Sequence, residues 1–279
     1  MKRILIPIDF SDNADRALAA AKIIANIEST QLIVLHAYQP YIADGGVASP
    51  VMGSTDFIPM SLELEQEFKD RLESYVEKLK IEGYNALGIW AVGSIRSAVD
   101  AATQEHNPDL IVLGRTGTGG FLDKLMGSSA THIALAASCP VMIIPPQVKP
   151  KRFDEVVYAT QFEYEENHIL REVIGLMKHL GGRLSLLKVN AATQPDIQPD
   201  HQYIEQIQKE FPIQDEDIVV RKASHVINGI EDYCDEVKAD LLIMSSRERS
   251  FIEEYLINPS VTKRLVVHTH IPLLVFHLK

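Results

Sequence analysis

The stretch Asp109–Gly120 reads DLIVLGRTGTGG, a short apolar run that passes directly into a glycine-rich segment. Short, unbroken apolar runs are typical of strands that are buried on both faces of a parallel sheet. Glycine lets backbone N–H groups approach a ligand closely, and a loop that follows a parallel strand lies at the ligand-binding edge of such a sheet. The stretch therefore predicts a central strand of an α/β sheet with a binding loop at its carboxyl end.

Strand-like apolar runs alternate with amphipathic helical segments on both sides of this stretch. The first strand is expected at Arg3–Asp9, and the helix that follows, at Asn13–Asn26, has apolar residues at helical spacing. Ser11 or Asp12 is placed to cap that helix. Further strands are expected at Gln31–Tyr38, Asn85–Trp90, Asp109–Leu113 and Pro140–Ile144, and further helices at Ser61–Ile81, Ser94–His106 and Gly127–Ala137. This alternation is typical of an α/β domain.

The same order of segments returns in the second half of the chain. Asp109–Leu113 matches Asp240–Met244 at an offset of 131, and Gln31–Ala37 matches Arg183–Val189 at an offset of 152. Between the two copies, the prolines of Pro145–Pro150 disfavour both helix and sheet, as in a stiff linker. We therefore predict two tandem doubly wound domains, residues 1–147 and 148–279. Each is expected to be a five-stranded parallel sheet of order 3-2-1-4-5 with helices on both faces.

Composition limits the possible partners. The 279 residues include 27 Lys+Arg and 38 Asp+Glu, for a net charge of −11, whereas nucleic-acid binding needs clustered basic residues. No apolar run reaches the length of a membrane span, and Pro7 and Asp9 interrupt the opening run too early for a signal peptide. Cys139 and Cys234 have no metal-binding or redox spacing. The sequence thus predicts a cytoplasmic protein with free thiols and with no nucleic-acid or membrane partner.

Two common phosphate-binding motifs are absent from the sequence. A P-loop requires Gly-Lys-Ser/Thr, which does not occur in the chain. A dinucleotide fingerprint requires G-x-G-x-x-G after the first strand, but the residues there are Asp9-Phe10-Ser11-Asp12. The spacing that does occur is G-x-x-G, nine residues, then G-[ST], formed by Gly114, Gly117, Gly127 and Ser128. It runs from the end of a strand to the expected start of a helix, where free N–H groups and the helix dipole favour an anion.

This glycine motif, in this position, resembles that of the universal stress protein family, in its ATP-binding subclass and tandem-domain form. The strand ends Pro7-Ile8-Asp9 and Leu35-His36-Ala37 and the closing Cys139-Pro140-Val141 belong to the same resemblance, which covers nearly the whole chain. It implies that Asp9, with Pro7 and Ile8 beside it, contacts adenosine and that Ala37 holds adenine through its backbone. It also implies a ribose and phosphate path, made by Leu113, Gly114, Arg115 and Gly117, and a phosphate site at Gly127, Ser128 and Ser129.

The function expected from this resemblance is that of a stress-response sensor or binding module. It would bind ATP or AMP in the first domain, with Mg²⁺ on the phosphates. A slow ATPase or a phosphoryl- or nucleotidyl-transfer enzyme is the alternative, but it requires a positioned base that the sequence does not identify. His36 is interpreted mainly as a strand-end residue that supports the site. A flexible glycine loop without any ligand remains a third interpretation.

The second half has a different set of residues in place of the motif. The counterparts of Gly114, Gly117, Gly127 and Ser128 are Ser245, Glu248, Asn258 and Pro259, and Thr160 is taken as the counterpart of Asp9. We therefore expect no ATP binding by this route in the second domain. The resemblance further implies that the edge strands Val141–Ile144 and Leu273–Phe276 meet inside one chain as an intramolecular pseudo-dimer. A further homodimer is compatible with this arrangement.

Overall fold

The computed structural model describes residues 1–39, 57–115, 123–191, 200–247 and 261–278, and every structural statement below concerns these residues. The first half contains β1 (Arg3–Ile8), α1 (Asp12–Ile24), β2 (Gln31–Tyr38), α2 (Phe57–Ile81), β3 (Asn85–Val92), α3 (Ile95–His106), β4 (Leu110–Gly114), α4 (Asp123–Ala136) and β5 (Val141–Ile144). The second half contains β6 (Glu155–Ala159), the 3₁₀ turn η1 (Tyr164–Glu166), α5 (Asn167–Leu180), β7 (Arg183–Ala191), α6 (Asp200–Glu210), η2 (Asp215–Asp217), β8 (Ile218–Ala223), α7 (Val226–Val237), β9 (Leu241–Arg247), α9 (Val261–His268) and β10 (Leu273–Leu278). The predicted α/β fold with two tandem domains is confirmed.

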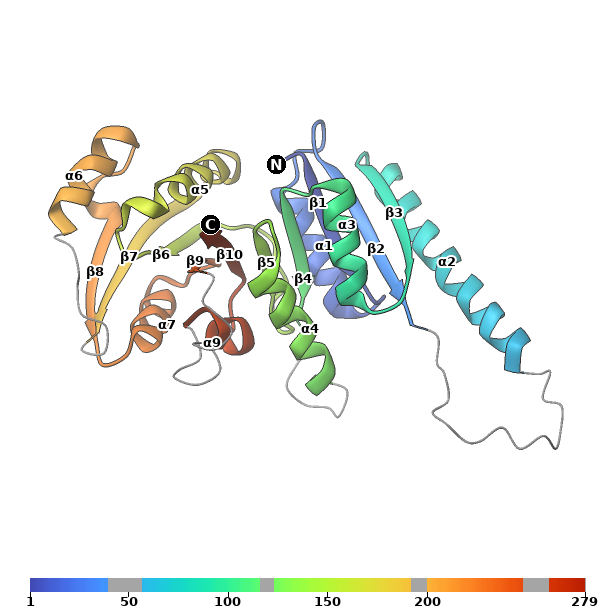
Figure 1. Ribbon diagram of the computed structural model, residues 1–279. Helices are drawn as coiled ribbons and strands as arrows, with labels where there is room; N and C mark the ends of the chain where they lie inside the picture. The colour runs from blue at the N-terminus through green and yellow to red at the C-terminus, as the bar shows by residue number, and fades with distance from the viewer. Residues whose placement is uncertain (40–56, 116–122, 192–199, 248–260, 279) are drawn as a thin grey trace.

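The strands form one continuous sheet in the order β3-β2-β1-β4-β5-β10-β9-β6-β7-β8. Within the first half the order is the predicted 3-2-1-4-5, and all neighbouring strands in each half are parallel. The two halves meet where β5 pairs antiparallel with β10, with Leu274 opposite Met142. Figure 1 shows the halves side by side, joined through this strand pair. The expected contact between the two edge strands is therefore present.

Helices cover both faces because alternate strand residues point to opposite sides. Ile4 and Ile6 of β1 belong to a core that includes residues of α1, α2, α5 and α6. Leu5 belongs to the opposite core, to which α3, α4, α7 and α9 contribute. Both cores continue across the β5–β10 junction into the second half. None of the helices among the described residues is long and apolar enough to cross a membrane.

One predicted boundary that bears on the site is wrong. The helix expected at Gly127–Ala137 begins at Asp123, so Gly127, Ser128 and Ser129 lie one turn inside α4. Nothing in the Asp123–Met126 segment interrupts a helix, and an acidic first residue suits the positive end of the helix dipole. Since the free N–H groups of a helix belong to its first turn, those of α4 belong to Asp123–Met126.

Candidate functional site

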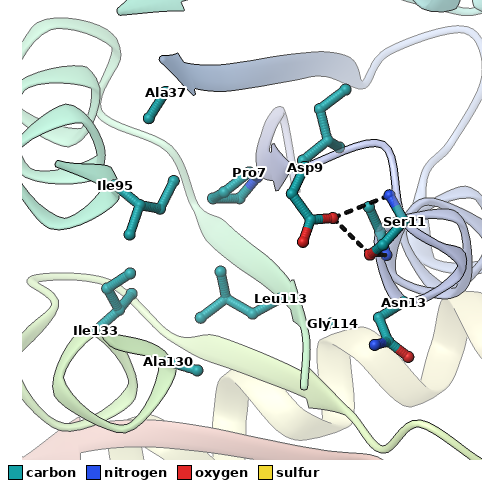
Figure 2. A pocket seen from close by; sticks show the side chains of 12 residues that line it. Pro7, Asp9, Ser11, Asn13, Ala37, Ile95, Leu113, Gly114, Ala130 and Ile133 are labelled. Carbon is teal, nitrogen blue, oxygen red and sulfur yellow. Dashed lines mark hydrogen bonds between the residues drawn. The ribbon is translucent and has the colours of Figure 1, made fainter. Parts of the chain in front are cut away.

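A pocket opens at the carboxyl ends of β1, β2 and β4, between the start of α1 on one side and α3 and α4 on the other. It encloses about 140 Å³. Its lining residues are Pro7, Ile8, Asp9, Ser11, Asn13, Ala14, Ala37, Ile95, Leu113, Gly114, Ala130 and Ile133. Figure 2 shows their side chains converging from these elements. The pocket lies where the strand order reverses between β1 and β4, the position at which open α/β sheets bind ligands.

Asp9 is held in place by the first turn of α1. Its Oδ1 atom accepts hydrogen bonds from the Ser11 backbone N–H, at 3.0 Å, and from the Ser11 hydroxyl, at 2.5 Å. Ser11 is the N-cap of α1, and its Oγ accepts from the N–H of Ala14. Figure 2 shows the other carboxylate oxygen of Asp9 directed toward the pocket. The helix cap is therefore Ser11, and Asp9 keeps an acceptor for a ligand hydroxyl or N–H group.

The chain turns sharply between β1 and α1 at Phe10, which has a left-handed φ of 61°. The Phe10 ring stacks on Phe68 of α2, with ring centroids 5.9 Å apart, and lies 4.6 Å from the ring of His36. His36 is buried, and its Nδ1 is hydrogen-bonded to the Ile8 carbonyl at 2.9 Å. Burial lowers the pKa of this imidazole. His36 thus supports the strand end from behind, as expected, and is not among the residues that line the pocket.

Gly114 is required where β4 passes the start of α1. A Cβ atom at this position would lie 2.2 Å from the carbonyl oxygen of Asn13, far inside van der Waals contact. The close approach joins the end of β4 to the first turn of α1, and residues of both line the pocket. The glycine of the sequence motif therefore has a steric reason for its presence.

The Arg115 side chain is directed toward the second half, and its predicted contact along the phosphate path stays a prediction. Its guanidinium donates to the carbonyl oxygens of Val266 (3.0 Å), Val267 and Thr269 (2.6 Å) at the carboxyl end of α9 in the second half. The carboxyl end of a helix attracts cations because its last carbonyls lack partners and the dipole is negative there. Burial lowers the pKa of this guanidinium. The Arg115 side chain thus joins the two halves and does not line the pocket.

The structure brings together six of the predicted site residues, namely Pro7, Ile8, Asp9, Ala37, Leu113 and Gly114. Gly117 lies outside the described residues. The backbone of Gly127, Ser128 and Ser129 belongs to α4, and their proposed contact with phosphates stays a prediction. Sequence reasoning missed several lining residues: Ser11, Asn13, Ala14, Ile95, Ala130 and Ile133. Ser11 was already a candidate N-cap of the first helix. A helix cap that directly follows a strand bordering the crevice is the signal that could have identified Ser11 as a lining residue.

The second half repeats the framework of this site with other residues. The offset of 152 that relates β1 and β2 to β6 and β7 places Gln161 opposite Asp9 and Phe162 opposite Phe10. Phe162 has the same left-handed backbone as Phe10, with a φ of 58°. Thr160 is therefore not the counterpart of Asp9, because it lies one residue earlier. Glu248, Asn258 and Pro259 lie outside the described residues.

Comparisons with known proteins agree with this fold. The chain is 31% identical over 149 residues to a universal stress protein of Thermus aquaticus, an alignment that covers 51% of this chain and 98% of that protein. Among solved structures, a universal stress protein of Archaeoglobus fulgidus superimposes with a TM-score of 0.73 at 20% identity, covering 100% of this chain and 99% of that chain. Another, a universal stress protein in complex with cAMP, is 23% identical with a TM-score of 0.36, covering 51% of this chain and 96% of that chain.

The family model matches both halves separately. The model described as the universal stress protein family covers residues 1–145 and residues 152–277. The break between the two matches contains most of the proline-rich segment that was predicted as a linker. The chain therefore belongs to the universal stress protein family and carries one family domain in each half.

Proposed function

We propose that the pocket of the first domain binds an adenine nucleotide, ATP or AMP, and that the protein acts as a nucleotide-dependent sensor or binding module. The observation that carries this proposal is the pairing of Asp9 and Gly114 at the tips of adjacent strands β1 and β4. A fixed carboxylate oxygen accepts from ribose hydroxyls, and the glycine lets the end of β4 pass close to α1 at the edge of the pocket. Both features lie at the strand-order reversal typical of nucleotide sites.

The remaining lining suits the flat faces of an aromatic base. Ile8, Ala37, Ile95, Leu113 and Ile133 supply aliphatic surface, and apolar walls with a few placed polar groups are typical of small-molecule sites. Phosphates would extend toward the first turn of α4, whose free N–H groups favour anions. Mg²⁺, when bound, would neutralise phosphate charge, and it characteristically keeps several water ligands together with phosphate oxygens.

Binding is favoured over hydrolysis by the chemistry of the lining. Asp9 is the one ionisable side chain among the described residues that line the pocket, and its Oδ1 is already committed to Ser11. General-base catalysis requires a group within hydrogen-bond reach of the attacking water. The imidazole of His36 faces the Ile8 carbonyl from behind the strand. A sensor that retains its nucleotide fits this arrangement better than an enzyme with turnover.

Titration calorimetry with ATP and with AMP tests the proposal. We expect about one site per chain, and a loss of affinity on the order of tenfold or more in Asp9→Ala, because a fixed charge-assisted hydrogen bond is worth roughly 1.5–3 kcal/mol. Asp12→Ala is the matched control, since Asp12 lies on α1 but does not line the pocket. Equal affinity in wild type and Asp9→Ala contradicts the proposed site. Multiple turnover of ATP, abolished in Asp9→Ala and kept in Asp12→Ala, supports the enzymatic alternative.

A further inference from the structure

Glu166 is a carboxylate buried at the carboxyl ends of β6 and β9. This position corresponds to that of the first-domain pocket, and we call it the crevice of the second domain. It ends η1, directly before α5, and only 1% of its surface is exposed. Acidic side chains are rarely buried to this degree without partners, because removing a charge from water is costly. The residues around Glu166 must therefore replace its hydration.

Hydrogen-bond donors from the ends of two strands, β6 and β9, converge on this carboxylate. The hydroxyls of Thr160 and Ser245 each donate at 2.6 Å, one to Oε2 and the other to Oε1. The backbone N–H of Gln161 donates to Oε2 at 3.0 Å, and the Tyr158 hydroxyl donates to Oε1 at 3.4 Å. Hydrogen bonds to an ionised acceptor are about twice as strong as neutral ones. The end of β6 and the end of β9 thus form a set of donors that suits one carboxylate.

The same place in the first domain is the open pocket. The offset of 152 places Glu166 at the position of Ala14, and the offset of 131 places Ser245 at the position of Gly114. Ala14 and Gly114 both line the first-domain pocket. The first domain has only the methyl group of Ala14 and the side-chain-free Gly114 at these two positions. The second domain has the Glu166 carboxylate, which accepts a hydrogen bond from the Ser245 hydroxyl. The two crevices therefore share a framework but differ in what occupies it.

We propose that the crevice of the second domain is a carboxylate-binding site whose ligand is the chain's own Glu166. The donors of Thr160, Gln161 and Ser245 form the site, and η1 delivers the carboxylate from within the same domain. The site recognises small carboxylate anions as a class. It is open to an external anion of this class once the side chain of Glu166 is shortened. This site is separate from the nucleotide pocket, so it stands or falls independently of the proposed function.

Chemical rescue of Glu166→Ala tests this proposal. The substitution introduces alanine, the residue at the equivalent position 14 of the first domain. It leaves the donors of Thr160, Gln161 and Ser245 unpaired around a cavity. We expect its melting temperature to fall by more than about 5 °C, because buried donors left without a partner are strongly destabilising. Sodium formate should raise the melting temperature of Glu166→Ala back toward that of wild type, and the effect should saturate with formate concentration. Sodium chloride at the same ionic strength is the reference.

The control for this experiment is Glu165→Ala, which removes a neighbouring exposed carboxylate. Formate should raise the melting temperature of Glu166→Ala well beyond any shift that it causes in wild type or in Glu165→Ala. Equal shifts in all three proteins, or no destabilisation in Glu166→Ala, overturn the proposal.

A double-mutant cycle keeps the proposal testable if Glu166→Ala yields too little folded protein. Ser245→Ala removes one donor and should lower the melting temperature, whereas Glu166→Gln keeps an acceptor oxygen and the side-chain shape. We expect Ser245→Ala to cost clearly less in the Glu166→Gln background than in wild type, because a neutral amide oxygen accepts a weaker hydrogen bond than a carboxylate. Additive effects of the two substitutions would show that Ser245 does not bind this carboxylate.

Discussion

Arg115, the residue after the last of β4 in the first domain, donates a hydrogen bond of 2.6 Å from Nη2 to the carbonyl oxygen of Thr269 in the second domain. Gly114, its immediate neighbour, lines the candidate nucleotide pocket. The backbone N–H of Arg115 also bonds to Ile144 of β5, the strand that joins the two halves of the sheet. One residue thus connects the edge of the pocket, the strand junction and the end of α9.

Arg115→Ala should weaken the contact between the domains and leave the pocket lining intact. Loss of a guanidinium that bonds three carbonyl oxygens leaves those acceptors unsatisfied, at a cost of roughly 2 kcal/mol. Urea unfolding followed by circular dichroism measures this cost. Arg152→Ala, which removes an exposed arginine in an ion pair with Asp154, is the control and should change stability by less than about 1 kcal/mol. A stability of Arg115→Ala equal to that of wild type contradicts a joining role.

Gly114→Ala should destabilise the fold and abolish nucleotide binding. The added Cβ would meet the Asn13 carbonyl oxygen at 2.2 Å, so β4 and the start of α1 must move apart. Such overpacking against backbone costs about 1–3 kcal/mol. Thermal unfolding and ATP titration are the measurements. Gly175→Ala in α5 is a matched control, because nothing lies within 4 Å of its added Cβ, and it should gain about 0.5–1 kcal/mol from higher helix propensity. Unchanged stability in Gly114→Ala would show that the two elements separate freely.

Stability should decline in acid partly through His36. Its pKa in the folded protein is lowered from 6.5, chiefly by burial, so the unfolded chain binds a proton more readily than the folded one. The contribution of neutral His36 to the free energy of unfolding therefore begins to decline as the pH falls through 6.5, the pKa in the unfolded chain. It is fully lost only below the pKa of His36 in the folded protein. Unfolding free energies measured between about pH 7.5 and 5 should fall less steeply in His36→Gln than in wild type. A slope in His36→Gln parallel to that of wild type would contradict this prediction.

The two cysteines should differ sharply in reactivity. Neither thiol forms a disulfide, but Cys234 is buried and Cys139 is half-buried. Burial raises the pKa of Cys234 to about 12, so almost no reactive thiolate forms near neutral pH. Labelling of native protein with a maleimide at about pH 7.5, read by mass spectrometry, should modify Cys139 well before Cys234. In urea both should react, which is the internal control. Fast native labelling of Cys234 would mean that α7 opens readily from the sheet.

Local patterns were sufficient to predict the elements and the candidate site in outline. Apolar runs such as Leu110–Leu113 identify buried strands because the signal lies within a few consecutive residues. Asp9 and Gly114 could be placed together because the carboxyl ends of parallel strands meet at one edge. The start of α4 was missed because glycine and serine at residues 127–129 suggested a boundary, whereas Asp123–Met126 already forms helix.

The sequence by itself determined the strand and helix order, the duplication and the edge of the sheet where a ligand would bind. These properties follow from periodicity and spacing, which are local. Only the tertiary structure decided which carbonyl oxygens the Arg115 guanidinium bonds to and which side chain lies in the crevice of the second domain. Arg115 meets Thr269 across 154 positions, and Glu166 meets Ser245 across 79. The reason is physical: a polar side chain bonds to whatever donors or acceptors the fold leaves unsatisfied nearby, and no local pattern records which distant segment supplies them.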